Sequence, residues 1–451
     1  MSDDTSAIDT TPSGSSSSLF NTFLSLCWKA NIFFSSVAVL AIGLLYLKQD
    51  SLLYFPTIQG LPQRPSQNPK RYRSPSEYNV PYETHLIPCK DGVILHSWLL
   101  YHPSTNSAAS SVPTIVFFHG NAGNIGLRLP NAHQMHQYLN ANVWLIDYRG
   151  YGDSDGVPTE NGLRLDAEAV WSYILNKKLE HVDPRKVFVF GRSLGGAVAF
   201  HLVKYAEKKH YDFDAKKVGG GVIQPPLPAG IIVENTFTSI SDMVDHLLPL
   251  VAPLKSIVLR INWDSISIVP KLTTPTLFLA GAKDTLVPHE HMLRLHRERS
   301  KGNINSLVRL HIVKDGTHNE TWLQGGKEYW VAIQSFLKEA LSAYNASGSN
   351  SYASNNVSLS NNSMNRPIQR KFAASTATLP EMKDSSLSIS TSTCPEGSNT
   401  EVVMGGEDAA GMISSVGNFM GMAREALKSG STKNIGAAPA SGGGQTYKKR
   451  E

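Results

Sequence analysis

The sequence has few cysteines and no excess of charge of either sign. Its 451 residues include three cysteines, Cys27, Cys89 and Cys394, which lie far apart. That spacing fits neither a disulfide framework nor a zinc site. Charged residues make up 18% of the chain, the formal net charge is +5, and the basic residues are scattered. The sequence therefore excludes a disulfide-stapled scaffold and indicates no nucleic-acid partner.

One long apolar run is present near the N-terminus. Residues 30–47 read ANIFFSSVAVLAIGLLYL and carry no charge between Lys29 and Lys48. A helix of this length spans about 27 Å, which is enough for the hydrocarbon core of a bilayer. We predict a transmembrane anchor at 30–47 after a polar, disordered segment at 1–29. A cleaved signal peptide is the main alternative, although Lys29 comes late for one, and a buried core helix is the third.

The flanking charges do not set the orientation of this anchor. Lys29 and Lys48 balance each other under the positive-inside rule. Glycosylation triplets, which would suit a lumenal domain, begin at Asn319, Asn345, Asn356 and Asn361. We expect a single-pass protein of the endoplasmic reticulum or plasma membrane, with the globular domain on either side.

Composition divides the rest of the chain into three parts. Residues 48–79 are Pro-rich and indicate an extended juxtamembrane linker. Residues 80–343 have the composition of one globular domain. Residues 344–451 are rich in Ser, Asn, Thr and Gly and predict a disordered tail. Within that tail, residues 412–427 place apolar side chains on one helical face, which suggests docking to a protein partner or to membrane lipid.

Strand-like and helical stretches alternate through the globular domain. The predicted strands are 93–101, 114–118, 143–146, 187–190, 231–234, 276–279 and 308–312; the predicted helices are 127–139, 162–177, 195–208, 289–299 and 327–343. The central strands are apolar throughout, as in a parallel sheet covered on both faces. We predict a mostly parallel, doubly wound α/β sheet with a small cap at 238–270 and a surface insert at 219–230.

A glycine-rich turn follows one of these strands directly. Residues 191–195 read Gly-Arg-Ser-Leu-Gly, between an apolar strand and a helix. The G-x-S-x-G pattern in this context forms a nucleophile elbow, a turn so sharp that its flanking positions have no room for a side chain. Ser193 is therefore the candidate nucleophile, and Gly191 and Gly195 are the residues that permit the turn.

A nucleophilic serine needs a base and an acid that orients the base. In the hydrolase fold these follow in the order serine, acid, histidine. Asp284 follows the strand at 276–279, and His318 follows the strand at 308–312. The alternative acids are Asp242 and Asp315, and the alternative bases are His289, His291 and His311. Asp284 and His318 are the pair that lies at both expected strand ends, although Asp284 could also cap a helix.

The loop at 119–124 reads HGNAGN and follows the strand at 114–118. It predicts one half of an oxyanion hole, formed by the backbone N–H of Asn121 together with that of Leu194. Ala122 is the alternative donor. The loop lacks the Lys-Ser/Thr of a phosphate-binding P-loop. The chemistry needs no metal or organic cofactor.

A second loop, 147–154, reads DYRGYGDS after another strand. It is expected to shape the wall of the site. We expect Arg149 to pair with Asp147 or Asp153 rather than to bind a substrate carboxylate.

Six motifs occur in a fixed order: HGNAGN, DYRGYGDSDG, GRSLGG, ENTFTSI, GAKDTLVP and DGTHN. Together they resemble the membrane-anchored α/β hydrolases of the group containing bud emergence protein 46 and α/β hydrolase domain-containing protein 13. The resemblance covers roughly residues 50–341. It implies an α/β-hydrolase fold on one N-terminal anchor, with a catalytic triad at Ser193, Asp284 and His318, and it names no substrate.

The expected function is hydrolysis of acyl esters or thioesters through an acyl-enzyme. Because the site lies close to the anchor, lipid-like acyl substrates are favoured over soluble peptides. The alternative is a non-catalytic membrane scaffold or polarity protein that keeps the hydrolase fold.

Overall fold

The computed structural model describes residues 15–103, 112–213, 224–249, 251–302 and 306–353. The first fourteen residues, residues 219–223 of the 219–230 insert and the tail beyond residue 353 lie outside these ranges, and so does the segment 412–427.

One sheet organises the globular domain. Its strands lie in the order β1-β2-β4-β3-β5-β6-β7-β8. Their bounds are β1 Tyr82–Pro88, β2 Ile94–Leu100, β3 Thr114–Phe118, β4 Asn142–Ile146, β5 Val187–Arg192, β6 Gly230–Glu234, β7 Thr276–Gly281 and β8 Val308–Val313. The two pairings of β2 are antiparallel and the others are parallel. The predicted mostly parallel α/β sheet is confirmed. Strand β1 was not predicted, because this half-exposed edge strand has no continuous apolar run.

Helices cover both faces of the sheet. On one face lie α3 (Leu129–Leu139) and α12 (Gly326–Ala353); on the other lie α4 (Glu160–Asn176), α5 (Leu194–Tyr211) and α10 (Glu290–Lys301). Alternate side chains of a strand point to opposite faces. Ile115 and Phe117 of β3 therefore pack with α3 and α12, while Val116 and Phe118 pack with α4 and α5. Helix α12 continues beyond residue 343, where the sequence had predicted its end.

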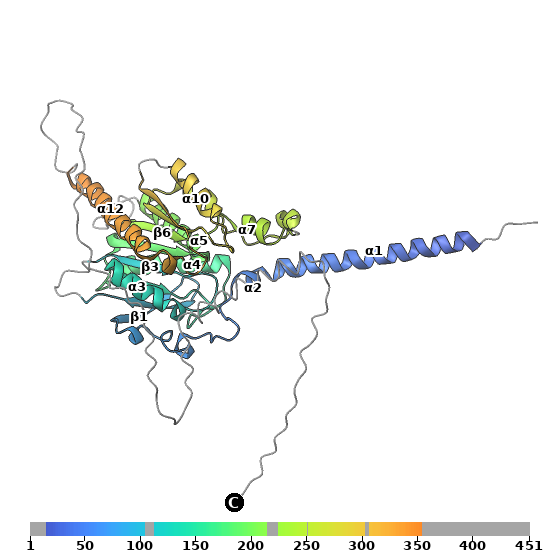
Figure 1. Cartoon of the computed structure of the whole chain (residues 1–451), viewed down its shortest axis with the longest axis horizontal. Coiled ribbons are helices and arrows are strands. Elements are labelled where there is room, and N and C mark those ends of the chain that lie inside the picture. Colours follow the sequence, from blue (N-terminus) through green and yellow to red (C-terminus); the bar gives the residue numbers. More distant parts are fainter. Residues whose placement is uncertain (1–14, 104–111, 214–223, 250, 303–305, 354–451) are drawn as a thin grey trace, which may run out of the picture.

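The N-terminal helix α1 (Ser15–Leu47) projects away from the domain as a single rod (Figure 1). Its stretch Phe20–Leu47 has a mean hydropathy of 2.0, and its most apolar part buries nothing against the domain. By length and composition this stretch can cross a bilayer. The helix begins at Ser15, well before the predicted start at residue 30. Lys29 does not interrupt it, because lysine is a good helix former and its long side chain can reach a polar layer.

Residues 48–79 are not an extended linker. They form α2 (Gln49–Leu53) and two short 3₁₀ turns, Pro65–Gln67 and Pro75–Tyr78. Ile58, Leu61 and Tyr72 are buried in a small cluster with Ala122 and Leu127. The apolar residues scattered among the prolines thus have a packing role, and the segment belongs to the globular domain.

The cap lies between β6 and β7, where the sequence placed it. It contains α7 (Ile240–Leu247), α8 (Lys255–Val258) and α9 (Ser265–Ile268), with 3₁₀ turns at Ala252–Leu254 and Val269–Lys271. Helix α7 lies close to the domain end of α1 (Figure 1), and α8 contacts α1. The remaining short elements are α11 (Thr321–Gln324) and 3₁₀ turns at Ile125–Arg128 and Pro184–Lys186.

Candidate active site

Ser193 occupies a sharp turn between β5 and α5. Its backbone has φ 54° and ψ −120°, a conformation that a residue with a side chain rarely adopts. A Cβ on Gly191 would overlap the carbonyl oxygen of Gly195, and a Cβ on Gly195 would overlap that of Phe118. Close backbone packing therefore requires both glycines and holds Ser193 at the carboxyl end of the sheet.

Ser193, His318 and Asp284 form one chain of hydrogen bonds. The Ser193 Oγ lies 3.0 Å from His318 Nε2, and His318 Nδ1 lies 2.7 Å from Asp284 Oδ2. The other oxygen of Asp284 accepts the N–H groups of Leu286 and Val287, both at 2.9 Å. The Asp284 carboxylate is fully buried. With Nδ1–H donating to Asp284, a neutral His318 leaves Nε2 free to accept the Ser193 hydroxyl proton.

The alternative acids have other partners. Asp315 forms an exposed pair with Lys283 at 2.7 Å, and Asp242 accepts a hydrogen bond from Arg294 at 3.0 Å. The alternative bases also lie elsewhere: His289 precedes α10, His291 is on α10, and His311 is on β8. Of the predicted candidates, the structure brings His318 and Asp284 to Ser193.

The two predicted oxyanion donors belong to residues that line the pocket beside Ser193. Asn121 and Leu194 both line it, and among the described residues neither N–H donates to a protein acceptor. Leu194 is the first residue of α5, where backbone donors are free and the helix dipole favours negative charge. The Asn121 carbonyl is held by Phe55 N–H and by the Tyr151 hydroxyl, each at 2.8 Å. The loop is thus fixed through its carbonyl while its N–H stays available.

Asn235 is a residue whose role the sequence did not indicate. It follows β6 with a left-handed φ of 47°. Its Nδ2 donates to the carbonyl oxygens of Thr317 and His318, both at 3.1 Å, and its Oδ1 accepts Gly281 N–H at 2.8 Å. One amide therefore ties the loop of His318 to the strand end that leads to Asp284. The motif ENTFTSI contains this residue, but its spacing alone assigns no function.

The segment after the anchor forms another wall that the sequence did not predict. Phe55 N–H donates to Asn121 O at 2.8 Å, and Gly123 N–H donates to Phe55 O at 2.9 Å. The side-chain amide of Asn121 donates to Leu53 O at 2.9 Å. The loop 119–124 is therefore hydrogen-bonded directly to the residues that follow α1.

The cap holds the same segment from the other side. Gln49 is buried, donates to Val258 O at 2.6 Å, and accepts Arg260 N–H at 2.8 Å. The indole N–H of Trp263 donates to Tyr54 Oη at 2.9 Å. Burial raises the pKa of the Tyr54 phenol well above its usual value, so the hydroxyl stays neutral. These contacts join the anchor end and the cap into one unit.

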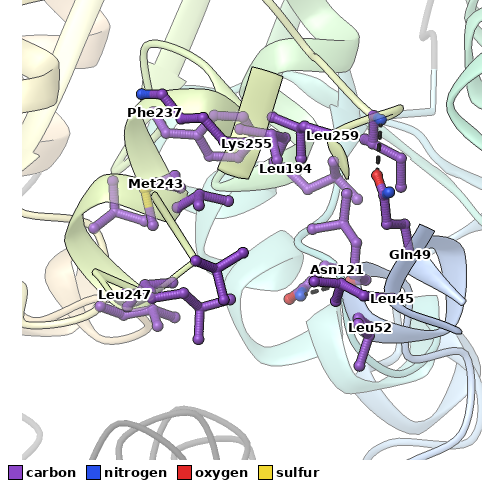
Figure 2. Close-up of a pocket in the computed structure, with 18 of the residues that line it drawn as sticks. Leu45, Gln49, Leu52, Asn121, Leu194, Phe237, Met243, Leu247, Lys255 and Leu259 are labelled. Atoms are coloured by element: carbon purple, nitrogen blue, oxygen red, sulfur yellow. Dashed lines mark hydrogen bonds between the residues drawn. The ribbon is translucent and has the colours of Figure 1, made fainter. Parts of the chain in front are cut away.

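The pocket between these elements has a volume of about 180 Å³ and contains Ser193. Seventeen of its twenty-one lining residues are apolar, so most of its wall cannot satisfy a polar ligand. Figure 2 shows Leu45 and Leu52 on one side, with Met243 and Leu247 of the cap on the other.

Comparison with known proteins agrees with this architecture. Residues 113–218 match the family model of the α/β hydrolase fold. The α/β hydrolase domain-containing protein WAV2 of Arabidopsis thaliana is 34% identical over 320 residues, which are 68% of this chain and 92% of the relative. The chain belongs to the α/β-hydrolase family.

Two fungal relatives extend the family assignment. Protein bem46 of Schizosaccharomyces pombe is 34% identical over 67% of this chain and 90% of its own. An uncharacterized membrane protein of Saccharomyces cerevisiae is 30% identical over 70% and 99%. The expected resemblance is confirmed, and the yeast relative's name agrees with an apolar anchor in this α/β hydrolase. An esterase structure from Pyrococcus furiosus superposes with a TM-score of 0.44 and 18% identity, over 59% of this chain and 94% of that one.

In this α/β hydrolase, Arg149 pairs with neither of the expected acids. Its guanidinium binds Asp166 at 2.8 Å and Asp91 at 2.7 Å. The hydrogen bond from Arg149 lowers the pKa of Asp91. Asp147 instead points inward and accepts the N–H of Ile125 at 2.9 Å. Arg149 therefore has a structural role in this loop, through its ion pairs with Asp91 and Asp166.

His119 of the HGN motif is a structural residue of the same loop. Complete burial lowers the pKa of His119 to about 3, so its ring is neutral at physiological pH. Its Nδ1 donates to Gly120 O at 2.7 Å, and its own carbonyl accepts the Tyr148 hydroxyl at 2.8 Å. This histidine shapes the loop that carries Asn121.

Proposed function

We propose that this protein is a serine hydrolase that cleaves carboxylic ester or thioester bonds through an acyl-enzyme. The observation that carries the proposal is the chain of hydrogen bonds from Asp284 through His318 to Ser193, which lines an apolar pocket. Nucleophile, base and orienting acid within hydrogen-bond reach are the requirements of such a reaction.

In the first half-reaction, Ser193 Oγ bonds to the acyl carbon while His318 Nε2 takes the hydroxyl proton. Asp284 keeps the ring oriented and stabilises the imidazolium. The N–H groups of Asn121 and Leu194 hold the negative oxygen of the tetrahedral intermediate. As that intermediate collapses, the bond to the leaving oxygen or sulfur breaks, and His318 gives the leaving group its proton.

Water completes the reaction. His318 removes a proton from water, whose oxygen attacks the acyl carbon of the ester on Ser193. Collapse of the second intermediate releases the carboxylic acid, and the proton returns from His318 to the serine oxygen. The enzyme ends in its starting state, and the net change is addition of one water across the ester or thioester.

The apolar pocket supports an acyl chain as the group that enters the site. A peptide or sugar would place polar groups against Phe237, Met243 and Val287, where they would lose hydrogen bonds to water without replacement. A hydrocarbon chain gains free energy from the same contacts.

Labelling with a fluorophosphonate probe tests the proposal. The probe reacts with an activated serine, so we expect covalent labelling of the wild type at Ser193 and none of Ser193→Ala. Ser172→Ala is the matched control, since Ser172 lies on α4 and contacts Tyr205 instead of the pocket. An unlabelled wild type, or a Ser193→Ala protein that keeps the label, would refute the proposal and favour a non-catalytic scaffold.

A further inference from the structure

The pocket that contains Ser193 extends to the membrane end of the domain. Its lining includes Leu45 of α1 and Leu52 of α2, together with Leu247 and Lys255 of the cap. Figure 2 shows Leu45 and Leu52 across the pocket from Leu247. The anchor is therefore part of the binding site as well as a tether.

Exposure increases along the pocket toward the anchor. Phe237, Met243 and Val287 are buried, at 4%, 7% and 2% exposure. Leu45 is half-buried and Leu52 is 48% exposed. This gradient places the open end of the pocket beside α1 and α2, and its closed end in the domain.

Exposed apolar side chains surround that open end. Leu44 and Leu47 of α1 are 50% and 70% exposed, and Ile257 of α8 is 74% exposed. Helices α1 and α8 are in contact, so these side chains lie at one end of the molecule. An apolar surface continuous with a membrane-crossing helix is suited to the boundary between headgroups and acyl chains.

The polar side chains at the outer part of the pocket already have partners. The amide of Gln49 is used by Val258 and Arg260, and Lys255 forms an ion pair with Asp245. The outer pocket therefore offers little to a phosphate or a sugar. It suits the hydrocarbon part of a lipid.

We infer that the substrate is a membrane lipid carrying a long acyl ester, whose chain enters the pocket laterally from the bilayer between α1–α2 and α7–α8. The inference rests on the proposed function. A chain with its carbonyl at Ser193 and its methyl end near Leu45 points toward the membrane, as it does in the leaflet. The apolar path also spares the chain contact with water.

The first test places the enzyme and its substrate in the same or in separate bilayers. The full chain is reconstituted into phosphatidylcholine vesicles, and p-nitrophenyl palmitate is added either to those vesicles or to a second vesicle population. We expect an initial rate about tenfold or more higher when both share a bilayer, because the chain then avoids water. Equal rates would overturn lateral entry.

The second test narrows the outer pocket. Leu247→Trp should lower the ratio of kcat/KM for palmitate to that for the butyrate ester by about tenfold, because the added ring obstructs the longer chain more. The control Leu86→Trp adds the same ring at an exposed site on β1, outside the pocket, and should leave the ratio unchanged. If Leu247→Trp does not fold, Leu52→Asp is measured in its place. Its charge at the exposed rim of the pocket should lower the same ratio of kcat/KM.

The two proposals fail in different ways. If the wild type neither labels nor cleaves butyrate, the proposed hydrolase function is wrong. If it cleaves butyrate while shared bilayers give no advantage and the outer-pocket variants keep the wild-type ratio, hydrolase function stands and the inferred lipid route is wrong.

Discussion

Two walls of one pocket are built in different ways. The polar wall consists of Ser193, which lines the pocket, and of His318 and Asp284, which are linked to it by hydrogen bonds. These residues follow β5, β8 and β7, and backbone packing and hydrogen bonds of 2.7–3.1 Å hold them in place. The apolar wall, formed by the anchor end and the cap, is held mainly by side-chain packing and by the contacts of Gln49 and Trp263. Under the proposed function the difference separates two tasks: the sheet edge fixes the reacting groups, and the elements next to the anchor helix select what reaches them.

The largest expected effect comes from breaking the polar wall alone. Asp284→Asn keeps the side-chain shape but donates to His318 Nδ1, which places the ring proton on Nε2 and prevents that atom from accepting the Ser193 proton. We expect kcat for p-nitrophenyl butyrate to fall by about 10⁴ with KM little changed. The measurement is steady-state kinetics with the full chain in detergent.

Asp315→Asn is the matched control, because Asp315 pairs with Lys283 on the surface. It should keep wild-type kinetics and thermal stability. A kcat for Asp284→Asn within tenfold of the wild type would mean that the buried carboxylate does not orient the base.

The polar wall was largely predictable from the sequence because each of its residues lies next to a structural signal. Ser193 sits in a turn that needs two glycines, and Asp284 and His318 each follow an apolar strand. In a parallel sheet the carboxyl ends of strands meet at one edge, so these positions converge. The structure does bring them into hydrogen-bond contact, and their catalytic roles stay predictions.

The apolar wall could not be predicted in the same way. Residues 48–79 look like a linker because their burial depends on residues far along the chain, such as the contact of Gln49 with Val258. The amino-acid composition of this segment does not indicate such a contact. Asn235 was missed for a related reason: it connects two loops that meet only after the sheet has formed. Strand β1 was not predicted because an edge strand is only partly buried, so its sequence needs no continuous apolar run.

A smaller effect should follow from uncoupling the two walls. Asn121→Ala keeps the backbone N–H of the oxyanion loop but removes the 2.9 Å hydrogen bond to Leu53 O. Loss of one such bond is expected to lower kcat by about tenfold, because the loop loses a fixed position. The butyrate KM should stay near the wild-type value, since the apolar side chains that line the pocket are unchanged.

Gln63→Ala is the control for this uncoupling. Gln63 also donates a side-chain amide to a backbone carbonyl, that of Gly150 at 3.1 Å. Its contact with the loop 119–124 is made by its backbone carbonyl, which accepts Asn124 Nδ2 at 2.9 Å and is kept in the alanine variant. Gln63→Ala should change kcat less than Asn121→Ala. Equal effects of the two variants would show that any hydrogen bond of this segment matters, and that the link between the walls has no special role.

The smallest effect lies outside both walls, on α3, and changes stability instead of catalysis. His136 is buried and stacks on His102, with ring centroids 3.7 Å apart. Burial, followed by the His102 charge, lowers the pKa of His136 to about 4. An unfolded histidine titrates near 6.5, so between these values the unfolded chain binds the extra proton and stability falls as the pH falls.

From pH 7 to pH 5 this group should lower the free energy of unfolding of the wild type by about 1–2 kcal/mol. The free energy of unfolding of His136→Phe should fall correspondingly less, while its fluorophosphonate labelling at pH 7 matches the wild type. Thermal unfolding of both full chains at the two pH values measures the difference; equal losses would show that His136 does not carry it, and slower labelling of the variant would show that α3 is coupled to the polar wall after all.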